Sequence, residues 1–299
     1  MHNINNFLKQ NGIVPRKYTI LKNSYIITTL DNKTYVIKKK KVDSNLLFDY
    51  LYSRGFDFFP KIIASNDNFE LFEYIEAVAI PNEQKSIDLI NIVSLLHLKT
   101  TYMKRVEKDF FKKIYEELYE KLNTLFNYYI DLITLVESEV YMSPASYHLA
   151  RNISKLFSCL NFCLITLDQW YELVKDKQKV RLVRAHNNLE VDHILNNKLI
   201  SFDKMKDEIP IYELLNFYKK DHKKLDFQTL YEIYYKKYPL YKDEAYLLSV
   251  LISIPDKIVF TKDNFNDCNL ISEMFEYIYL TEELATKTIK KENTEIYKD

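Results

Sequence analysis

Strand-forming patterns fill the first quarter of the sequence, and helical patterns fill most of the remaining three quarters. Residues 18–37 hold β-branched and aromatic runs that polar turns interrupt twice, which predicts three antiparallel strands. Apolar residues at helical spacing predict one helix in 42–56, and a further strand pair is predicted in 60–76, turning at 66–68. This order of elements describes a small lobe with an antiparallel sheet, which we place at residues 1–76.

Local signals predict where the first helices begin and end. Residues 1–12 have the pattern of a short amphipathic helix that Gly12 ends. Ser44 is the expected N-cap of the helix in 42–56, and Gly55 is its expected stop.

Residues 77–299 are predicted to form a large, mainly helical lobe. Within it, 105–139 and 145–175 are two long amphipathic segments, separated by the helix start signal Ser143-Pro144. Together with the sheet of the first lobe, this arrangement predicts an α+β, bilobal fold.

The helical pattern is interrupted once. In 182–203, two short strand-like pieces, LVRAH and KLISFD, flank a loop. Helices resume near Ile211 and are expected to run to about Ala285, after which a polar tail is expected to fray.

Composition excludes several classes of site. The chain has only two glycines, Gly12 and Gly55, so no glycine-rich loop that could cradle a phosphate can be written. Lysine plus arginine equal aspartate plus glutamate at 42 each, which predicts neither nucleic acid nor a membrane as a partner.

The three cysteines predict no disulfide framework, because their number is odd and none forms a C-x-x-C pair. Cys159 and Cys163 lie four residues apart in an apolar helical pattern, which predicts core residues. The N-terminus has no pattern of a signal peptide and no run approaches about 18 apolar residues, so we expect a cytoplasmic protein.

The interruption of the helical pattern contains the most specific motif. Residues 184–218 follow the frame H-G-D-x-x-x-x-N-I/L-L, then L-I-D-F/W-D, then D-P-x-Y-D-L-A-x-F. The segment resembles small-molecule kinases of the aminoglycoside phosphotransferase and choline kinase type, and the lobe order resembles a protein-kinase-like fold. The positions in register are His186, Leu189, Ile194, Leu195, Leu199, Ile200, Phe202, Asp203, Pro210, Tyr212, Leu214 and Phe217.

The resemblance implies that the reacting positions have changed. Asn188 stands where such kinases have the aspartate that orients the attacking hydroxyl. His193 and Ser201 stand where they have the asparagine and the aspartate that hold magnesium, while Asp203 survives. His186 corresponds to a buried histidine that braces the loop. The resemblance therefore implies a kinase fold without ordinary kinase activity.

Lys38 ends a strand that resembles the V-A-I-K strand, whose lysine pairs nucleotide phosphates and a helix carboxylate. The helix that comes next offers Asp49 or, at its start, Asp43 as that partner, but no glutamate. Lys38, Asp49, His193 and Ser201 are therefore the positional equivalents of cofactor-binding residues.

The loop allows two other interpretations. Glu190 and Asp192 could supply the missing acidity, although Glu190 should point differently from Asn188. His186, Asp192, His193 and Asp203 match no spacing typical of a zinc site, so no metal site is predicted. His97, on an apolar helix, is expected to be a hydrogen-bonded structural residue.

Within this superfamily the chain looks most like CotS-type spore-coat kinase-like proteins, through the tail DEIPIYELLNFYKK and the broken H-G-D motif. This likeness implies a catalytically impaired kinase-like protein, a pseudokinase, that acts as a binding or scaffold module with a protein assembly partner or a small-molecule ligand. The alternative is an active ATP-dependent phosphotransferase on a small hydroxylated substrate, which would need ATP and Mg²⁺. A third interpretation is an unrelated α+β protein with an accidental motif.

Overall fold

The computed structural model describes residues 2–21, 24–261 and 263–295. The chain divides into two compact units, which we describe separately. The first holds the described parts of Met1–Tyr102, Val183–Glu208 and Thr229–Tyr238, and the second those of Met103–Leu182, Ile209–Gln228 and Pro239–Asp299. Three segments far apart in the sequence thus build the first unit. The lobe boundary at residue 76, which was placed from the order of the sequence patterns, stays a prediction.

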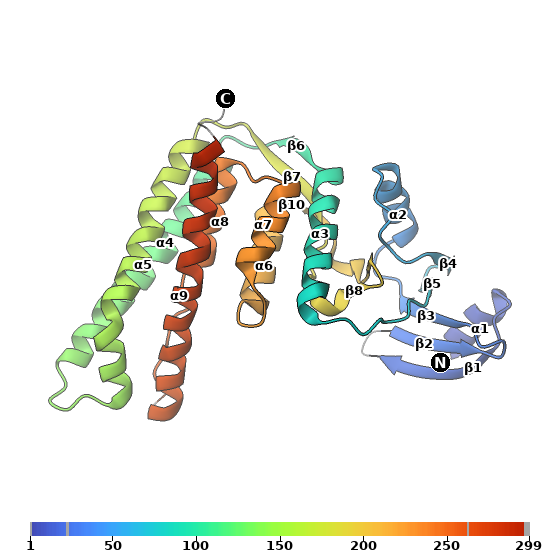
Figure 1. The fold of residues 1–299 in the computed structure, drawn as a ribbon, viewed down its shortest axis with the longest axis horizontal. Coiled ribbons are helices and arrows are strands. Elements are labelled where there is room, and N and C mark those ends of the chain that lie inside the picture. The colour runs from blue at the N-terminus through green and yellow to red at the C-terminus, as the bar shows by residue number, and fades with distance from the viewer. Residues whose placement is uncertain (1, 22–23, 262, 296–299) are drawn as a thin grey trace. The chain divides into compact units, whose positions relative to one another are not determined.

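A five-stranded antiparallel sheet in the order β1-β2-β3-β5-β4 forms one part of the first unit (Figure 1). Its strands are β1 (Pro15–Leu21), β2 (Ser24–Thr29), β3 (Thr34–Lys39), β4 (Ile62–Ser65) and β5 (Phe69–Glu73). The three strands and the later strand pair predicted from sequence are confirmed, while the turn expected at Lys22-Asn23 lies outside the described residues.

Helix α1 (His2–Gln10) closes one face of the sheet. Its apolar side chains join those of β2, β3 and β5 in one buried cluster, because alternate residues of a strand point to the same face. The cluster consists of Ile4, Phe7, Leu8, Ile27, Ile37, Phe69 and Leu71. Gly12 follows the helix with a φ of +69°, as its predicted role as a stop requires.

Helix α2 (Ser44–Ser53) begins one residue earlier than predicted. Its N-cap is Asp43 and not Ser44, because the Asp43 carboxylate accepts hydrogen bonds from the backbone N–H groups of Asn45 and Leu46 at 3.1 and 3.3 Å. Gly55 follows the last turn with a φ of +74°, as predicted.

The rest of the first unit surrounds helix α3 (Asn82–Thr100), which contacts the 3₁₀ turn η1 (Val191–His193) and the short strand β8. Strands β8 (Ile194–Leu195) and β9 (Lys198–Leu199) form a hairpin, and the last residues of β7 (Lys179–Ala185) pair with β10 (Lys206–Glu208). The predicted strand KLISFD is only partly correct, since Phe202–Lys204 forms a 3₁₀ turn, η2.

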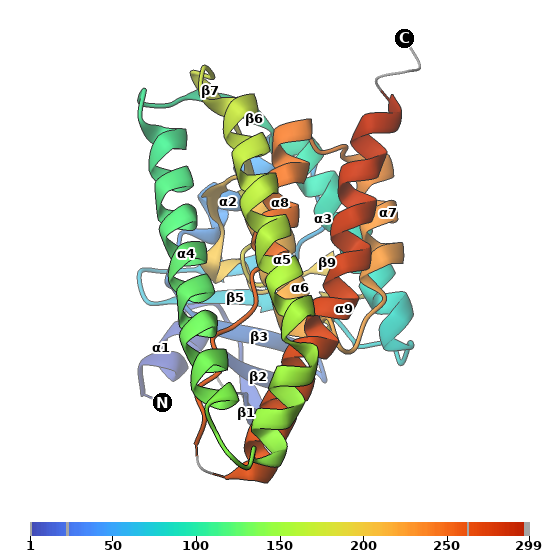
Figure 2. The same ribbon diagram turned by 90° about the vertical axis from the view of Figure 1, so that its left-hand side faces the viewer.

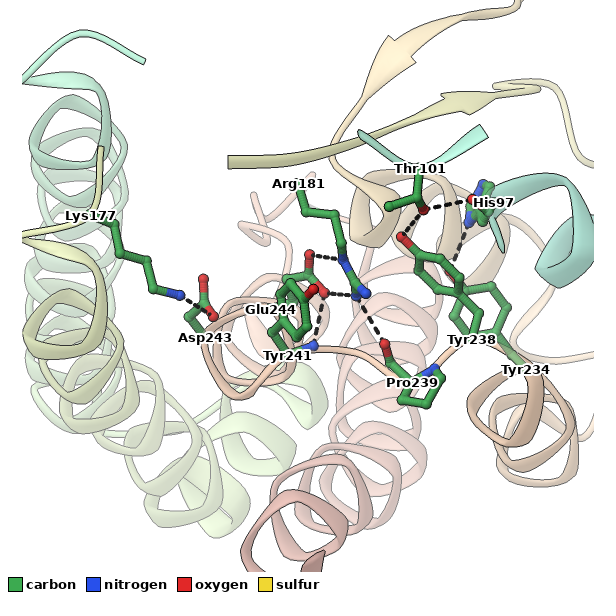
Figure 3. Close-up of polar contacts among 10 residues, drawn as sticks. All are labelled: His97, Thr101, Lys177, Arg181, Tyr234, Tyr238, Pro239, Tyr241, Asp243 and Glu244. Atoms are coloured by element: carbon green, nitrogen blue, oxygen red, sulfur yellow. Dashed lines mark hydrogen bonds and ion pairs between the residues drawn. The ribbon is translucent and has the colours of Figure 1, made fainter. Parts of the chain in front are cut away.

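His97 on α3 is the buried, hydrogen-bonded histidine that the sequence predicted (Figure 3). Its Nδ1 lies 2.7 Å from the hydroxyl of Tyr234, which comes from α7 (Phe227–Lys237). Thr101 donates its hydroxyl to the carbonyl of His97, so the hydroxyl of Tyr238 must donate to Thr101, 2.8 Å away.

The second unit is mainly helical. Helix α5 lies between α4 and α9 in Figure 2, and α8 packs against α5 and α9. Ser143 caps α5 as predicted, and Cys163 is buried in its core face while Cys159 is half-buried. The elements are β6 (Tyr102–Arg105), α4 (Phe110–Glu137), α5 (Pro144–Val174), α6 (Pro210–Asp221), α8 (Lys242–Ser253) and α9 (Asn264–Glu295).

Helix α9 continues beyond the predicted end near Ala285, which corrects the expectation of a frayed tail from that point. Thr288 is completely buried there and donates its hydroxyl to the carbonyl of Leu284. Within the described part of the chain, no helix combines the length and the hydropathy needed to span a bilayer.

A buried ion pair joins β7 to α8 inside the second unit (Figure 3). Arg181 and Glu244 are 7% and 5% exposed, and the guanidinium donates from Nε to one carboxylate oxygen at 2.9 Å and from Nη2 to the other. Burial raises the pKa of Glu244 against the opposing effect of Arg181, so the pair is desolvated at a cost that its geometry must offset.

Replacing the N-cap of α2 tests the corrected helix start. We expect Asp43→Ala to lower the free energy of unfolding by about 1 kcal/mol, because two backbone N–H groups lose their acceptor. Asp49→Ala, an exposed change on the same helix, should alter it by less than about 0.5 kcal/mol. Urea unfolding measures both, and equal effects would contradict the assignment of the cap.

Removing one partner of the buried ion pair should destabilise the protein strongly. We expect Glu244→Ala to cost about 3 to 5 kcal/mol, because Arg181 would remain buried with its charge uncompensated. Asp243→Ala breaks only the more exposed pair with Lys177 and should cost about 1 kcal/mol or less. Chemical denaturation of the two variants would refute this ranking if their midpoints coincided.

Candidate functional site

The candidate site is a pocket of about 180 Å³ in the first unit, between the sheet and the segment that follows β9. Most of its lining is apolar and comes from the sheet, from α2 and from the segment 195–202, whereas polar side chains reach it from β2, β3, β5, α2 and the turn at 201–203. The apolar lining includes Ile26, Val36, Phe48, Phe72, Leu195 and Ile200, and the polar lining includes Ser24, Lys38, Ser44, Glu73, Ser201 and Asp203.

Lys38 lies near the end of β3, in register with Glu70 on β5. Its ammonium is 5.9 Å from the centroid of the Phe72 ring. Burial lowers the pKa of Lys38, and the negative charges of Asp203 and Glu70 oppose that effect. The protein therefore keeps a lysine at the pocket although the surroundings disfavour its charged form.

Two carboxylates act on Lys38, Asp203 and Glu70, and neither is one of the two helix residues predicted as its partner. Glu70 is 3% exposed and accepts hydrogen bonds from the backbone N–H and the hydroxyl of Ser44, at 2.9 and 2.6 Å. Asp43 instead pairs with Lys40 at 2.9 Å. No sequence motif points to Glu70; its only signal is a carboxylate flanked by apolar residues in the strand FELFE.

Asp49, the other predicted partner, is an exposed residue of α2. No ion pair joins it to Lys38 within the described residues, and it does not line the pocket. The structure thus brings Lys38, Ser201 and Asp203 to one pocket but leaves Asp49 outside it.

The loop before β8 is held by its two histidines. His186 donates from Nε2 to the carbonyl of Ile200 at 2.8 Å, and its ring lies 5.2 Å from that of Phe202. His193 donates from Nδ1 to the carbonyl of Asn188 at 2.6 Å, because a carbonyl can only accept. One ring nitrogen of His193 is therefore engaged within the loop itself.

Neither acidic residue of the loop stands free at the pocket. Asp192 is paired with Lys85 of α3 at 3.6 Å and its side chain is 86% exposed. The carboxylate of Glu190 lies 3.9 Å from Nε2 of His193. Asp192 thus joins the loop to α3, Glu190 lies near a histidine of the same loop, and neither residue lines the pocket.

Ser201 adopts a left-handed backbone conformation, with φ 68° and ψ 49°. This conformation is uncommon for serine and costs on the order of 1 to 3 kcal/mol, so the surroundings must impose it. The turn directs Phe202 into the core against Phe48, 5.2 Å between ring centroids, and Asp203 to the pocket. Asp203 lies 3.9 Å from the ammonium of Lys41.

The polar groups of the pocket are a poor fit for magnesium. Magnesium takes oxygen ligands in nearly octahedral geometry, usually one or two carboxylates beside substrate phosphates. Here Asp203 is near Lys41 and acts on Lys38, the carboxylate of Glu73 accepts a hydrogen bond from the ammonium of Lys198, and Ser201 offers only a neutral hydroxyl. The described residues contain no group of three or more His, Cys, Asp or Glu side chains that could hold a metal ion.

No family model matches the chain, and neither does any curated protein. Among solved structures, an aminoglycoside phosphotransferase from Alicyclobacillus acidocaldarius subsp. acidocaldarius DSM 446 matches with a TM-score of 0.61 at 9% identity, covering 93% of each chain. Choline kinase LicA from Streptococcus pneumoniae matches with a TM-score of 0.46 at 13% identity, covering 97% of this chain and 100% of that one. The first likeness shows the fold: this chain has the α+β, bilobal kinase-like fold of an aminoglycoside phosphotransferase.

Replacing Lys38 should stabilise the protein. A lysine whose pKa is lowered in the folded state costs stability at pH values below that pKa, and the cost disappears as the pH rises toward the unfolded value. We therefore expect Lys38→Met to raise the urea midpoint at pH 7, with a gain that shrinks at alkaline pH. Lys39→Met, at an exposed position of the same strand, is the matched control and should show neither effect.

Proposed function

We propose that this protein is a catalytically impaired kinase-like protein that binds a ligand in the pocket of its first unit and acts as a binding or scaffold module. The observation that carries the proposal is the polar lining of that pocket, in which Asp203 lies 3.9 Å from the ammonium of Lys41 and Ser201 contributes only a neutral hydroxyl. The kinase-like fold is thus combined with a site that has few of the charges that phosphoryl transfer requires.

The chemistry of the loop supports impaired catalysis. The amide of Asn188 cannot take a proton at neutral pH, and losing a positioned base typically costs a factor of about 10² to 10⁴ in rate. His193 spends Nδ1 on the carbonyl of Asn188 and prefers softer metals than magnesium. Both changes act in the same direction, against magnesium-dependent transfer.

The pocket itself supports ligand binding. Apolar side chains from the sheet and from the segment after β9 would accept a flat, apolar group such as a nucleotide base. Asp203 interacts electrostatically with both Lys38 and Lys41. Together these two lysines would attract an anionic group such as a phosphate. Such binding would not need a divalent cation, because two ammonium groups are supplied by the chain.

An active phosphotransferase on a small hydroxylated substrate is the second candidate. Its support is the fold, shared with an aminoglycoside phosphotransferase, and the survival of Lys38 and Asp203 at the pocket. Asp192 would have to leave Lys85 to take part in catalysis. A role in a spore coat or another assembly of a cytoplasmic protein rests on the sequence likeness alone and stays a prediction.

Melting temperature with ATP or GTP, each with and without Mg²⁺, tests the proposal. We expect millimolar nucleotide to raise it without Mg²⁺, because a ligand that binds only the folded state stabilises that state. Lys38→Met should abolish the rise and Lys39→Met should keep it. We expect no release of ADP from ATP with Mg²⁺ present.

Two outcomes would decide against the proposal. A rise that requires Mg²⁺, together with release of ADP, would favour the active phosphotransferase. The absence of any rise would exclude nucleotides as the ligand of the pocket.

A further inference from the structure

A small pocket of about 160 Å³ lies in the second unit, between α5 and α9, with the end of α8 on its wall. Phe162 and Ile278 contribute apolar atoms to its lining. Lys155 and Glu282 line it with opposite charges and form an ion pair at 3.5 Å, so their charges compensate each other. The thiol of Cys159, which is half-buried, also lines the pocket. The pocket therefore gives a small molecule access to a thiol in a packed helical core.

A second thiol lies one helical turn from the first. Cys163 follows Cys159 by four residues on α5, so both side chains lie on the same face of the helix. Cys163 is completely buried, and its thiol donates a hydrogen bond to the sulfur of Cys159. Small molecules from solvent thus reach Cys159, while Cys163 is a hydrogen-bond donor held beneath it.

Ionisation is favoured at Cys159 and disfavoured at Cys163. The hydrogen bond from Cys163 lowers the pKa of Cys159, although burial and the charge of Glu282 oppose that effect. The same hydrogen bond raises the pKa of Cys163, which therefore keeps its proton. Because the thiolate is the nucleophilic form of cysteine, the contact increases the fraction of Cys159 that can react at neutral pH.

Ser253, the last residue of α8, presents two polar groups near the sulfur of Cys159. Its carbonyl accepts a hydrogen bond from that thiol, at 3.1 Å between sulfur and oxygen. Its hydroxyl is buried and finds no hydrogen-bond partner among the residues that the structure describes, which is uncommon for a buried polar group. Ser253 is 3% exposed and lines the same pocket. An oxygen atom bonded to the sulfur of Cys159 would give this hydroxyl an acceptor.

A disulfide between the two thiols would require α5 to deform. Residues four apart on a helix have Cβ atoms about 5 to 6 Å apart, whereas the Cβ atoms of a disulfide are about 3.5 to 4.5 Å apart. Both cysteines lie well inside α5, which packs against α8 and α9 as well as α4. Oxidation is therefore expected to stop at the sulfur of Cys159.

We propose that Cys159 is a site of reversible oxidation, at which a small peroxide converts the thiol to a sulfenic acid. The sulfur attacks one peroxide oxygen, the O–O bond breaks, and the second oxygen leaves as water with the thiol proton. The sulfur loses two electrons and the peroxide gains them. The new S–O–H group donates to the carbonyl of Ser253, as the thiol does now, and accepts from its hydroxyl.

Peptide mass spectrometry of the full chain of 299 residues tests the proposal, which does not depend on the proposed function of the first unit. The protein is treated with hydrogen peroxide and dimedone, which alkylates sulfenic acids, and each cysteine is followed over time. We expect dimedone to label Cys159 at least about threefold faster than Cys268 and to leave Cys163 unlabelled. Cys268 is the internal reference, because it is half-buried but does not line this pocket.

The size of the peroxide tests whether the pocket is the route to the thiol. Cumene hydroperoxide carries a bulky aromatic group, which a pocket of about 160 Å³ should hinder. We expect it to lower the labelling of Cys159 relative to Cys268 by at least about threefold, compared with hydrogen peroxide.

Two variants of Cys163 separate its hydrogen bond from its packing. Cys163→Ser keeps a donor of similar size, so the oxidation rate of Cys159 should stay within about twofold. Cys163→Ala removes the donor and should slow oxidation about three- to tenfold at pH 7, while moving the pH profile of the rate to higher pH.

Two serine variants test the fate of the sulfenic acid. Ser253→Ala removes the hydroxyl that would donate to the added oxygen, so further oxidation to the sulfinic acid should become at least about threefold faster. Ser158→Ala is the matched control at the same pocket, because the hydroxyl of Ser158 already donates to the carbonyl of Ser154 at 2.9 Å. It should leave the lifetime of the sulfenic acid unchanged.

Contrary results would overturn the proposal. Labelling that favours Cys268, or no label on Cys159, would refute the site. A disulfide between Cys159 and Cys163, seen as the loss of two hydrogens from their peptide, would refute the sulfenic acid as the product. Equal rates in Cys163→Ser and Cys163→Ala would refute the role of the donor, and an unchanged ratio with the bulky peroxide would refute the route through the pocket.

Discussion

A buried carboxylate, Glu70, joins the sheet of the first unit to the first turn of α2, and the candidate site depends on this connection. The carboxylate is 3% exposed and receives both the backbone N–H and the hydroxyl of Ser44. A buried carboxylate without such donors would be strongly disfavoured, so these two hydrogen bonds hold the two elements together. Because Lys38 is in register with Glu70, the same charge helps to keep an ammonium at the pocket.

The loop before β8 is held by hydrogen bonds from side chains to backbone carbonyls. His186 and His193 donate to the carbonyls of Ile200 and Asn188, and these acceptors belong to the backbone, whatever the side chain. The loop conformation therefore does not require an aspartate at Asn188. Phosphoryl transfer depends on charged side chains, so these backbone contacts hold the loop independently of any catalytic role.

The strand and helix order, the caps at Gly12, Gly55 and Ser143, and the buried His97 could all be predicted from sequence. The elements and caps depend on hydrophobic periodicity and backbone geometry within a few residues. The burial of His97 follows from its place on the apolar face of a periodic helix. The N-cap of α2 was missed by one residue, because Asp43 and Ser44 are both good caps and only the backbone decides between them. The effect of Glu70 on Lys38 could not be predicted in this way, since Glu70 comes from a strand 32 residues later and not from the helix that the motif suggested. Register across a sheet is a long-range property, set by the pairing of strands and by the packing of their apolar faces.

The sequence by itself therefore determined the fold class and the positions of most elements. These properties can be predicted because hydrophobic periodicity and helix caps depend on residues that are close together in the sequence. The tertiary structure alone decided which charges meet: Asp203 and Glu70 near Lys38, and Glu244 on Arg181. The physical reason is that electrostatic interactions depend on distance in space, which only the packed chain defines.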